Sequence, residues 1–403
     1  MSEYTETLPP IRWADAPKAA YDVVIIGGGG HGLSTAYHLA ARHGITSVAV
    51  LEADYIASGN TGRNTTIIRA NYGIPEAIRF YQHSLELYQG LEDETGADIL
   101  HQTKGIVWLA HTEMAMRTER ARAAMNQACG AQTFMRTPEE LKALIPQLDL
   151  TGGGRYPVLG GSHHVEGATA RHDRVAWAYA SGASRRGVDL FQHTVVTGIR
   201  RDGDRVTGVE TSRGPIAAGA VLSAAGGRVT QVAAMAGVRL PVRTHPLHAF
   251  VTNDHAPGFP IILASTELAC YVSQTERGQM LIGAEFDSQP SYSRQASFAA
   301  LRSYSYKITR LLPFLASMRI LRQWAGICDI SVDFSPIMSA TPVDGFYVTT
   351  GWGTWGFKAI PAGGEGMAAL IATGRLPALI APFTLERFRR DHVLADAGSA
   401  GTR

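Results

Sequence analysis

Hydrophobic and polar residues along the first fifty positions follow the order of a strand, a turn and a helix. Asp22–Ile26 ends in four apolar residues, which predicts a short buried strand. Glycines follow, and from about His31 to His43 apolar residues recur every three or four positions, the period of an amphipathic helix. Gly44 is suited to a left-handed cap at the end of this helix. The apolar run Ser47–Leu51 then predicts a second strand.

The rest of the chain divides into helical and strand-rich parts. Pro75 opens an amphipathic helix that Gly96 closes. From about Leu240 to Trp324 strand-like runs dominate, and a helix from Ser293 to about Leu312 interrupts them. The last part returns to a strand, Gly345–Thr350, followed by another helix. This order predicts an α/β protein with a second domain built on an antiparallel or mixed sheet.

Composition narrows the class of protein. The chain has 403 residues, 45% of them hydrophobic and 18% charged, and a net charge of +2. These values are typical of a globular protein. The small net charge, together with the lack of a segment rich in Lys and Arg, argues against a nucleic-acid partner. Cys129, Cys270 and Cys328 are too widely spread for a disulfide framework or a metal site. No segment resembles a signal core or a membrane helix, so we expect a cytoplasmic protein that does not enter a membrane.

The glycines after the first strand match a nucleotide-binding fingerprint. Gly27, Gly29 and Gly32 give the spacing G-x-G-x-x-G between a strand and a helix, and Glu52 follows the next strand. Glycine permits a sharp turn and close approach to a pyrophosphate, while the helix N-terminus supplies free N–H groups. Glu52 is placed to accept hydrogen bonds from a ribose. The fingerprint predicts an ADP moiety but leaves NAD and FAD open.

Two features favour a flavin. The segment 55–69 after Glu52 is long, polar and rich in glycine, whereas a nicotinamide-binding fold usually continues directly into another βα unit. A second glycine loop, Gly351–Gly356, repeats G-x-G-x-x-G just before a C-terminal helix. The N-terminus of that helix would stabilise negative charge on a reduced flavin.

Several motifs together identify a family. Residues 23–33 (VVIIGGGGHGL), 59–69 (GNTGRNTTIIR), 170–173 (ARHD) and 351–358 (GWGTWGFK) resemble the β subunits of heterotetrameric sarcosine oxidases. These belong to the D-amino-acid oxidase and sarcosine oxidase group of FAD-dependent amine oxidoreductases. The resemblance extends over about residues 20–390.

The resemblance implies a fold and its division. It implies a Rossmann-like, glutathione-reductase-like FAD-binding domain from residues 19–87, 153–238 and 326–390. A D-amino-acid-oxidase-like substrate and interface domain would then comprise residues 88–152 and 239–325.

It also implies a reaction. FAD would bind noncovalently and oxidise sarcosine, and electrons would pass to a covalent FMN and then to O2. The products would be glycine, H2O2 and formaldehyde or methylene-tetrahydrofolate. The expected partners are α, γ and δ subunits, with NAD and tetrahydrofolate on those subunits.

Three residues are candidates for the substrate site. Arg69 and Lys358 each follow a cofactor loop and match carboxylate-binding positions of the related amine oxidases; Arg grips a carboxylate with two hydrogen bonds and Lys adds a point charge. Ordinary surface charge is the alternative for this pair. Tyr271 lies on an otherwise apolar strand and either lines the same pocket or belongs to the core.

His172 is the position that matches the flavin-linked histidine of the family. A neutral imidazole nitrogen is a competent nucleophile, and Arg171 would stabilise developing negative charge. The alternative is a polar residue at a helix start with Asp173 as N-cap, and without the resemblance this alternative would be preferred. The full set of expected cofactor-binding residues is Gly27, Gly29, Gly30, His31, Gly32, Glu52, Asn60, Arg63, Thr65, Ile67, His172, Val196, Gly353, Gly356 and Lys358.

Two other functions stay open. One is a stand-alone FAD oxidase or dehydrogenase acting on a D-amino acid, dimethylglycine or proline, which would be active without partners. The other is a flavin-binding assembly factor without catalysis, against which the charges of Arg69 and Lys358 argue.

Overall fold

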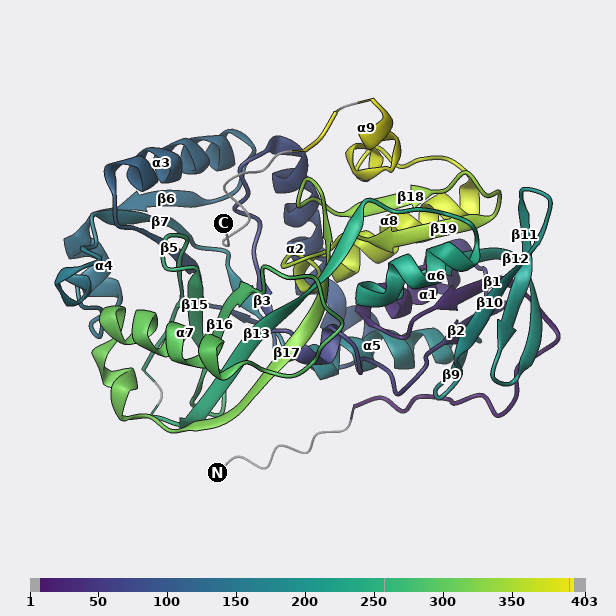
Figure 1. Ribbon diagram of the computed structural model, residues 1–403, viewed down its shortest axis with the longest axis horizontal. Coiled ribbons are helices and arrows are strands. Elements are labelled where there is room, and N and C mark those ends of the chain that lie inside the picture. Colours follow the sequence, from purple (N-terminus) through teal and green to yellow (C-terminus); the bar gives the residue numbers. More distant parts are fainter. Residues whose placement is uncertain (1–7, 257, 391, 395–403) are drawn as a thin grey trace.

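A computed structural model describes residues 8–256, 258–390 and 392–394, without the side chains of residues 284 and 285. Over these residues the chain forms two eight-stranded sheets and a small three-stranded sheet. Figure 1 shows the first sheet beside α1, α5, α6 and α8, and the second sheet beside α3, α4 and α7. The strand β17 runs from the second sheet toward the first.

The helices are α1 (Gly30–His43), α2 (Pro75–Thr95), α3 (Glu113–Ala128), α4 (Pro138–Leu144), α5 (His172–Ser184), α6 (Val229–Met235), α7 (Phe298–Leu311), α8 (Ile360–Thr373) and α9 (Glu386–Arg389). The strands of the first sheet are β1 (Ala20–Ile26), β2 (Val48–Leu51), β9 (Asp189–Phe191), β10 (Val196–Asp202), β11 (Arg205–Thr211), β12 (Gly214–Ser223), β18 (Ile337–Ala340) and β19 (Phe346–Thr350). Those of the second sheet are β5 (Ile106–Ala110), β6 (Thr133–Arg136), β7 (Gly160–His164), β13 (Val242–Asp254), β14 (Ile262–Ser265), β15 (Cys270–Gln274), β16 (Gln279–Phe286) and β17 (Ile320–Ser331). The small sheet contains β3 (Ile67–Ile68), β4 (Gln102–Thr103) and β8 (Ala168–Thr169).

The first sheet has the parallel centre that the βαβ pattern predicts. β1 pairs in parallel with β2 on one side and with β12 on the other, and β12 pairs in parallel with β19. Alternate residues of β1 enter different cores: Val23 and Ile25 pack with α1, α2, α5 and α8, while Val24 and Ile26 pack with α6 and the hairpin β10–β11. Such a doubly covered sheet leaves its strand ends open for a ligand.

The second sheet is mixed, as the sequence predicts. Its order is β17-β13-β16-β15-β14-β5-β7-β6, and only the β14–β5 pair is parallel among the pairs described. Its apolar core includes residues of α4 and α7. β7 pairs with β5 in this sheet, although it lies within residues 153–238, which are predicted to belong to the FAD-binding domain. The division into two domains itself stays a prediction.

Helix boundaries follow local signals closely. α1 ends at Gly44 with φ 67° and α2 ends at Gly96 with φ 70°, both in the left-handed region that glycine favours. α7 begins later than predicted, because Ser297 is its N-cap and accepts a hydrogen bond from the Ala300 N–H. None of the helices in the described part of the chain is both long and apolar enough to cross a membrane.

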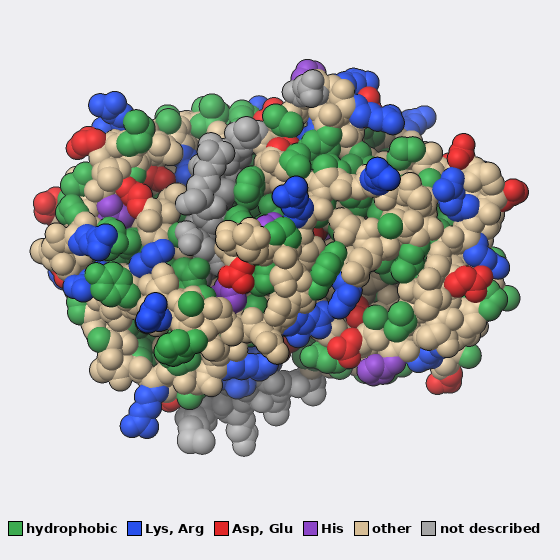
Figure 2. Space-filling model, in the orientation of Figure 1, with side chains coloured by type: hydrophobic (Ala, Val, Ile, Leu, Met, Phe, Trp, Pro, Cys, Tyr) green, Lys and Arg blue, Asp and Glu red, His purple; other side chains and the backbone are tan. Residues whose placement is uncertain are grey.

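Positive and negative side chains are mixed on the face of the molecule shown in Figure 2. Figure 2 shows basic and acidic side chains interspersed over one face, outside the atoms drawn in grey. Among the residues that the structure describes, no group of three or more His, Cys, Asp or Glu is arranged to hold a metal ion.

Candidate functional site

The first glycine turn leaves no room for side chains. Gly27 has φ 115°, and a Cβ there would lie 2.4 Å from the Ala224 carbonyl oxygen. A Cβ on Gly32 would lie 2.0 Å from the Gly27 carbonyl oxygen, so Gly32 is needed for α1 to pack against the turn. Glu52 accepts a hydrogen bond of 2.8 Å from the Gly28 N–H, which fixes its carboxylate beside the turn. The turn therefore combines close backbone packing with the N-terminus of α1.

The turn opens into a cavity of about 630 Å³. This cavity brings together residues from all parts of the sequence, as expected for a nucleotide site at the carboxyl ends of parallel strands. The predicted residues that line it are Gly27, Gly29, Gly30, His31, Glu52, Asn60, Arg63, Thr65, Ile67, Arg69, Val196, Tyr271, Gly353, Gly356 and Lys358. Gly32 lies behind the wall, and His172 lines a different cavity.

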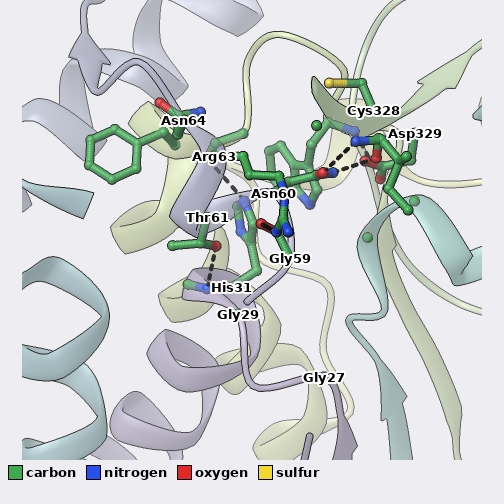
Figure 3. A pocket seen from close by; sticks show the side chains of 18 of the residues that line it. Gly27, Gly29, His31, Gly59, Asn60, Thr61, Arg63, Asn64, Cys328 and Asp329 are labelled. Carbon is green, nitrogen blue, oxygen red and sulfur yellow. Dashed lines mark hydrogen bonds between the residues drawn. The ribbon is translucent and has the colours of Figure 1, made fainter. Parts of the chain in front are cut away.

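The polar segment after β2 forms one wall of the cavity and ties it to β17. The Asn60 side chain donates to the Ile327 carbonyl oxygen at 2.6 Å and accepts from the Ile327 N–H at 2.9 Å. Thr61 accepts from the Gly30 N–H at 3.0 Å, so the segment also touches the start of α1. Figure 3 shows the Asn60 and Thr61 side chains bridging these two elements. The side chain of Arg63 donates to the Gly59 carbonyl oxygen at 3.0 Å, and burial lowers the pKa of its guanidinium.

The second glycine loop closes the cavity from the C-terminal side. His31 stacks on Trp352 with ring centroids 4.0 Å apart, and its Nε2 lies 3.0 Å from the Gly356 carbonyl oxygen. Burial lowers the pKa of His31 to about 3, so the imidazole stays neutral. Asp329 holds the other end of the loop, because its carboxylate accepts from the Thr350 hydroxyl at 2.8 Å and the Trp352 N–H at 3.4 Å.

Arg69 and Lys358 are buried cations in the same cavity. Arg69 is 5% exposed and Lys358 is 6% exposed. The Arg69 guanidinium donates to the carbonyl and side-chain oxygens of Asn71, both at 3.0 Å, and the Lys358 ammonium donates to the Thr354 carbonyl oxygen at 3.0 Å. Burial, followed by the nearby charge of Arg69, holds the pKa of Lys358 well below its usual range. Two such charges favour an anionic ligand between them.

Apolar residues surround this cationic end of the cavity. Ile67, Ile106, Trp108 and Ala264 form a small cluster, against which Tyr271 packs. The Tyr271 hydroxyl lies 2.7 Å from the Thr65 hydroxyl, and burial raises the pKa of Tyr271 to about 12. A Cβ on Gly283 would lie 1.9 Å from the Tyr271 ring, so Gly283 makes room for that ring. This end therefore suits a small ligand with one anionic group and an apolar body.

A second cavity of about 570 Å³ contains His172. Ser58, Arg63 and Asn64 line both cavities, so the Ser58–Asn64 segment forms a shared wall. Burial lowers the pKa of His172. The alternative interpretation of His172 is wrong in one detail, because Asp173 is not the N-cap. α5 begins at His172 with Arg171 as N-cap, and the Asp173 carboxylate accepts from Arg171 Nε at 3.0 Å.

Comparison with known proteins identifies the family. The family profile described as "DAO: FAD dependent oxidoreductase" matches residues 22–370. The chain belongs to the FAD-dependent oxidoreductases. It is 42% identical to "Sarcosine oxidase subunit beta" of Arthrobacter sp over 99% of both chains, and 43% identical to the protein of that name from Rhizobium meliloti over 96% of this chain and 94% of that one.

Solved structures agree on the fold of this FAD-dependent oxidoreductase. L-proline dehydrogenase from P. horikoshii matches with a TM-score of 0.87 and 28% identity, over 93% of this chain and 99% of that one. Glycine oxidase from Geobacillus kaustophilus matches with a TM-score of 0.82 and 23% identity, over 91% and 99%. The enzyme is thus a flavin-dependent oxidoreductase with the fold of the DAO family.

The cavity fits the FAD that the family binds. The missing side chains at Gly27 and Gly29 open the turn, the N–H groups at the start of α1 suit a pyrophosphate, and the carboxylate of Glu52 suits a ribose. Sequence reasoning did not single out Asp329 or Trp108, which also line the cavity. Neither lies in a glycine motif, and each reaches the site only through long-range strand packing. Cys328, for which the sequence indicates no disulfide or metal role, is also part of the lining.

Proposed function

We propose that this chain is the β-type subunit of a multimeric sarcosine oxidase. The observation that carries the proposal is the presence of two buried cations, Arg69 and Lys358, in the cavity that the FAD fingerprint opens into. The relatives named sarcosine oxidase subunit beta support the amine substrate and a multi-subunit assembly. When bound, FAD supplies the acceptor for a hydride equivalent from the N-methyl carbon of sarcosine.

Each residue at the cationic end of the cavity has a distinct role in this proposal. Arg69 and Lys358 bind the sarcosine carboxylate, and their positive charge disfavours a protonated amine nearby. The substrate nitrogen is therefore held in its neutral form, which is the form that gives up a hydride equivalent most readily. Tyr271 and the apolar cluster confine the N-methyl group and exclude water from it.

His172 is the proposed attachment point of a covalent FMN, which when bound supplies the site from which electrons reach O2. The lowered pKa of His172 keeps its imidazole neutral and nucleophilic at neutral pH. The cations lining the second cavity, among them Lys104, Arg277 and Arg322, suit a phosphate. Because the Ser58–Asn64 segment lines both cavities, it supports a short path for electrons from FAD in the first cavity to FMN in the second.

Products and partners complete the proposal. Loss of the hydride equivalent would convert sarcosine to an imine. Hydrolysis of this imine gives glycine and formaldehyde, or its methylene group passes to tetrahydrofolate on a partner subunit. O2 is reduced to H2O2. An α subunit would close the second cavity, and γ and δ subunits and NAD would complete a cytoplasmic assembly.

We also propose that the FAD-binding domain comprises residues 19–87, 153–238 and 326–390.

Replacing His172 tests the covalent flavin. The expected result is that His172→Ala, co-expressed with the partner subunits, leaves no yellow colour in acid-precipitated protein, because the nucleophilic nitrogen is gone. His163→Ala is the control, since His163 lies on β7 outside the lining of either cavity, and its precipitate should stay yellow. A yellow His172→Ala precipitate would show that the assignment is wrong.

Expression of the chain alone tests the alternative of a stand-alone oxidase or dehydrogenase. A β-type subunit should hold FAD but lack a complete FMN site without its partners. Full turnover of proline, dimethylglycine or a D-amino acid by the isolated chain would favour the alternative.

A further inference from the structure

Helix α3 buries an ion pair among its residues. Arg122 and Glu119 lie 3.0 Å apart, and their side chains are 3% and 5% exposed. The Ser162 hydroxyl donates to the Glu119 carboxylate at 2.5 Å. Removing two charges from water is expensive, and apolar residues of similar size are often as stable in such places. Stability alone therefore does not account for this pair.

One aromatic ring, that of Trp108, lies near both this ion pair and Arg69, the arginine predicted to bind a carboxylate. The Arg122 guanidinium lies 5.2 Å from the centre of the Trp108 ring, and the Arg69 guanidinium lies 5.0 Å from it. Tyr72 lies against Arg69 at 4.3 Å. Two aromatic rings thus lie against the Arg69 guanidinium, and the attraction between a cation and an aromatic face is strong when both are desolvated.

The same region also fixes the backbone on either side of Arg69. Asn126 of α3 donates to the Tyr72 carbonyl oxygen at 2.7 Å. His164 Nε2 accepts from the Ala70 N–H at 3.3 Å, and burial lowers the pKa of His164 to about 3, so this acceptor is not lost to protonation at neutral pH. The contacts of α3 and β7 therefore converge on Arg69 and its neighbours.

We propose that Trp108, Arg122 and Glu119 are positioning residues that hold the guanidinium plane of Arg69 in register with an incoming carboxylate. The inference rests on the carboxylate role proposed for Arg69. Glu119 forms an ion pair with Arg122, so Arg122 can support Trp108 with its charge balanced. A small error in the plane of Arg69 would cost one of its two hydrogen bonds to the carboxylate.

The test uses the FAD-loaded enzyme and two probes, acetate and its neutral isostere acetamide, titrated by the change in the visible flavin spectrum. The variants are Trp108→Leu, Trp108→Phe and the double change Glu119→Leu with Arg122→Met, which leaves no unpaired buried charge. The control is Glu386→Leu with Arg389→Met, an exposed pair at the same helical spacing. Flavin content and unfolding temperature are measured for every variant.

The expected result is a Kd for acetate about tenfold higher in Trp108→Leu and in the double variant, with acetamide binding changed much less. Trp108→Phe keeps an aromatic face and should retain most of the affinity. KM for sarcosine should rise by the same factor as the acetate Kd. In the double variant, whose two residues do not line the cavity, the limiting rate of flavin reduction should stay within about twofold.

Three outcomes would overturn the inference. Unchanged acetate affinity in Trp108→Leu, where Arg69→Met does weaken acetate, overturns the positioning role alone and leaves the proposed function standing. Equal weakening of acetate and acetamide shows general loosening of the cavity instead of positioning. Unchanged acetate affinity in Arg69→Met overturns the carboxylate role and with it this inference. If the double variant loses flavin, the two Trp108 variants still decide between these results.

Discussion

Replacing Lys358 with Met removes a buried charge while keeping the length of the side chain. Lys358 is 6% exposed, and its ammonium lies in the cavity that also holds Arg69. A hydrogen bond to a charged group contributes about 1.5–3 kcal/mol. Loss of that bond to a carboxylate should raise the Kd of acetate and the KM of sarcosine by about 10- to 150-fold. FAD content should stay unchanged, because the ammonium serves the substrate end of the cavity.

The same change should stabilise the protein before substrate binds. Burial and the charge of Arg69 lower the pKa of Lys358 in the folded state, so the unfolded state binds more protons between the lowered pKa and the ordinary lysine pKa of about 10.4. Stability of the natural chain therefore rises with pH through that window. Lys358→Met removes the cost of the buried charge, so its unfolding temperature should be higher at neutral pH, and the difference should vanish as pH approaches about 10.4.

The pH dependence of acetate binding checks the carboxylate role of Lys358. Spectral titration with acetate across pH should show affinity falling as pH rises through the pKa of Lys358 in the natural enzyme, and no such fall in Lys358→Met. Lys142→Met is a matched control, since the Lys142 ammonium also donates to a backbone carbonyl, that of Pro146 at 2.8 Å, but on α4. Equal acetate affinity and equal pH dependence in Lys358→Met and the natural enzyme would refute the carboxylate role of Lys358.

Two further predictions concern the two ends of the cavity. Gly32→Ala places a Cβ 2.0 Å from the Gly27 carbonyl oxygen, so the purified variant should contain little FAD by absorbance, and full FAD content would contradict the packing role of Gly32. Tyr271→Phe removes the 2.7 Å hydrogen bond to Thr65, which should cost about 1 kcal/mol and raise KM for sarcosine less than tenfold; a loss of FAD in this variant would instead place Tyr271 in the cofactor end.

Local sequence signals predicted the parts of the fold that short-range physics determines. The first βα unit, the glycine caps at Gly44 and Gly96, and the apolar stripe of α2 all appear in the structure. The α/β class and the mixed second sheet were also confirmed. These features depend on periodicity and on backbone conformations that few residues other than glycine adopt.

Features that depend on distant partners were not predicted. The strand β7 has the sequence GGSHH, which lacks apolar alternation, and it is held in the sheet by β5 and β6 on either side. The alternative interpretation of His172 had Asp173 as the N-cap of α5, whereas Arg171 is the N-cap and the Asp173 carboxylate accepts from Arg171.

The candidate site shows the same contrast. Motif position indicated that Arg69 and Lys358 face a cofactor, and the structure places both in one cavity. No local pattern in the sequence indicates that Trp108 would lie near both Arg69 and Arg122, since these three residues come from separate parts of the chain and meet only in the folded protein.

Anaerobic addition of sarcosine to the purified enzyme tests the central claim most directly. The account predicts that sarcosine bleaches the visible absorbance of bound FAD, with half-saturation that is weakened in Arg69→Met and in Lys358→Met. Acetate should shift the spectrum without bleaching it. FAD that stays oxidised with saturating sarcosine, yet is bleached by proline or a D-amino acid, would contradict the proposed substrate.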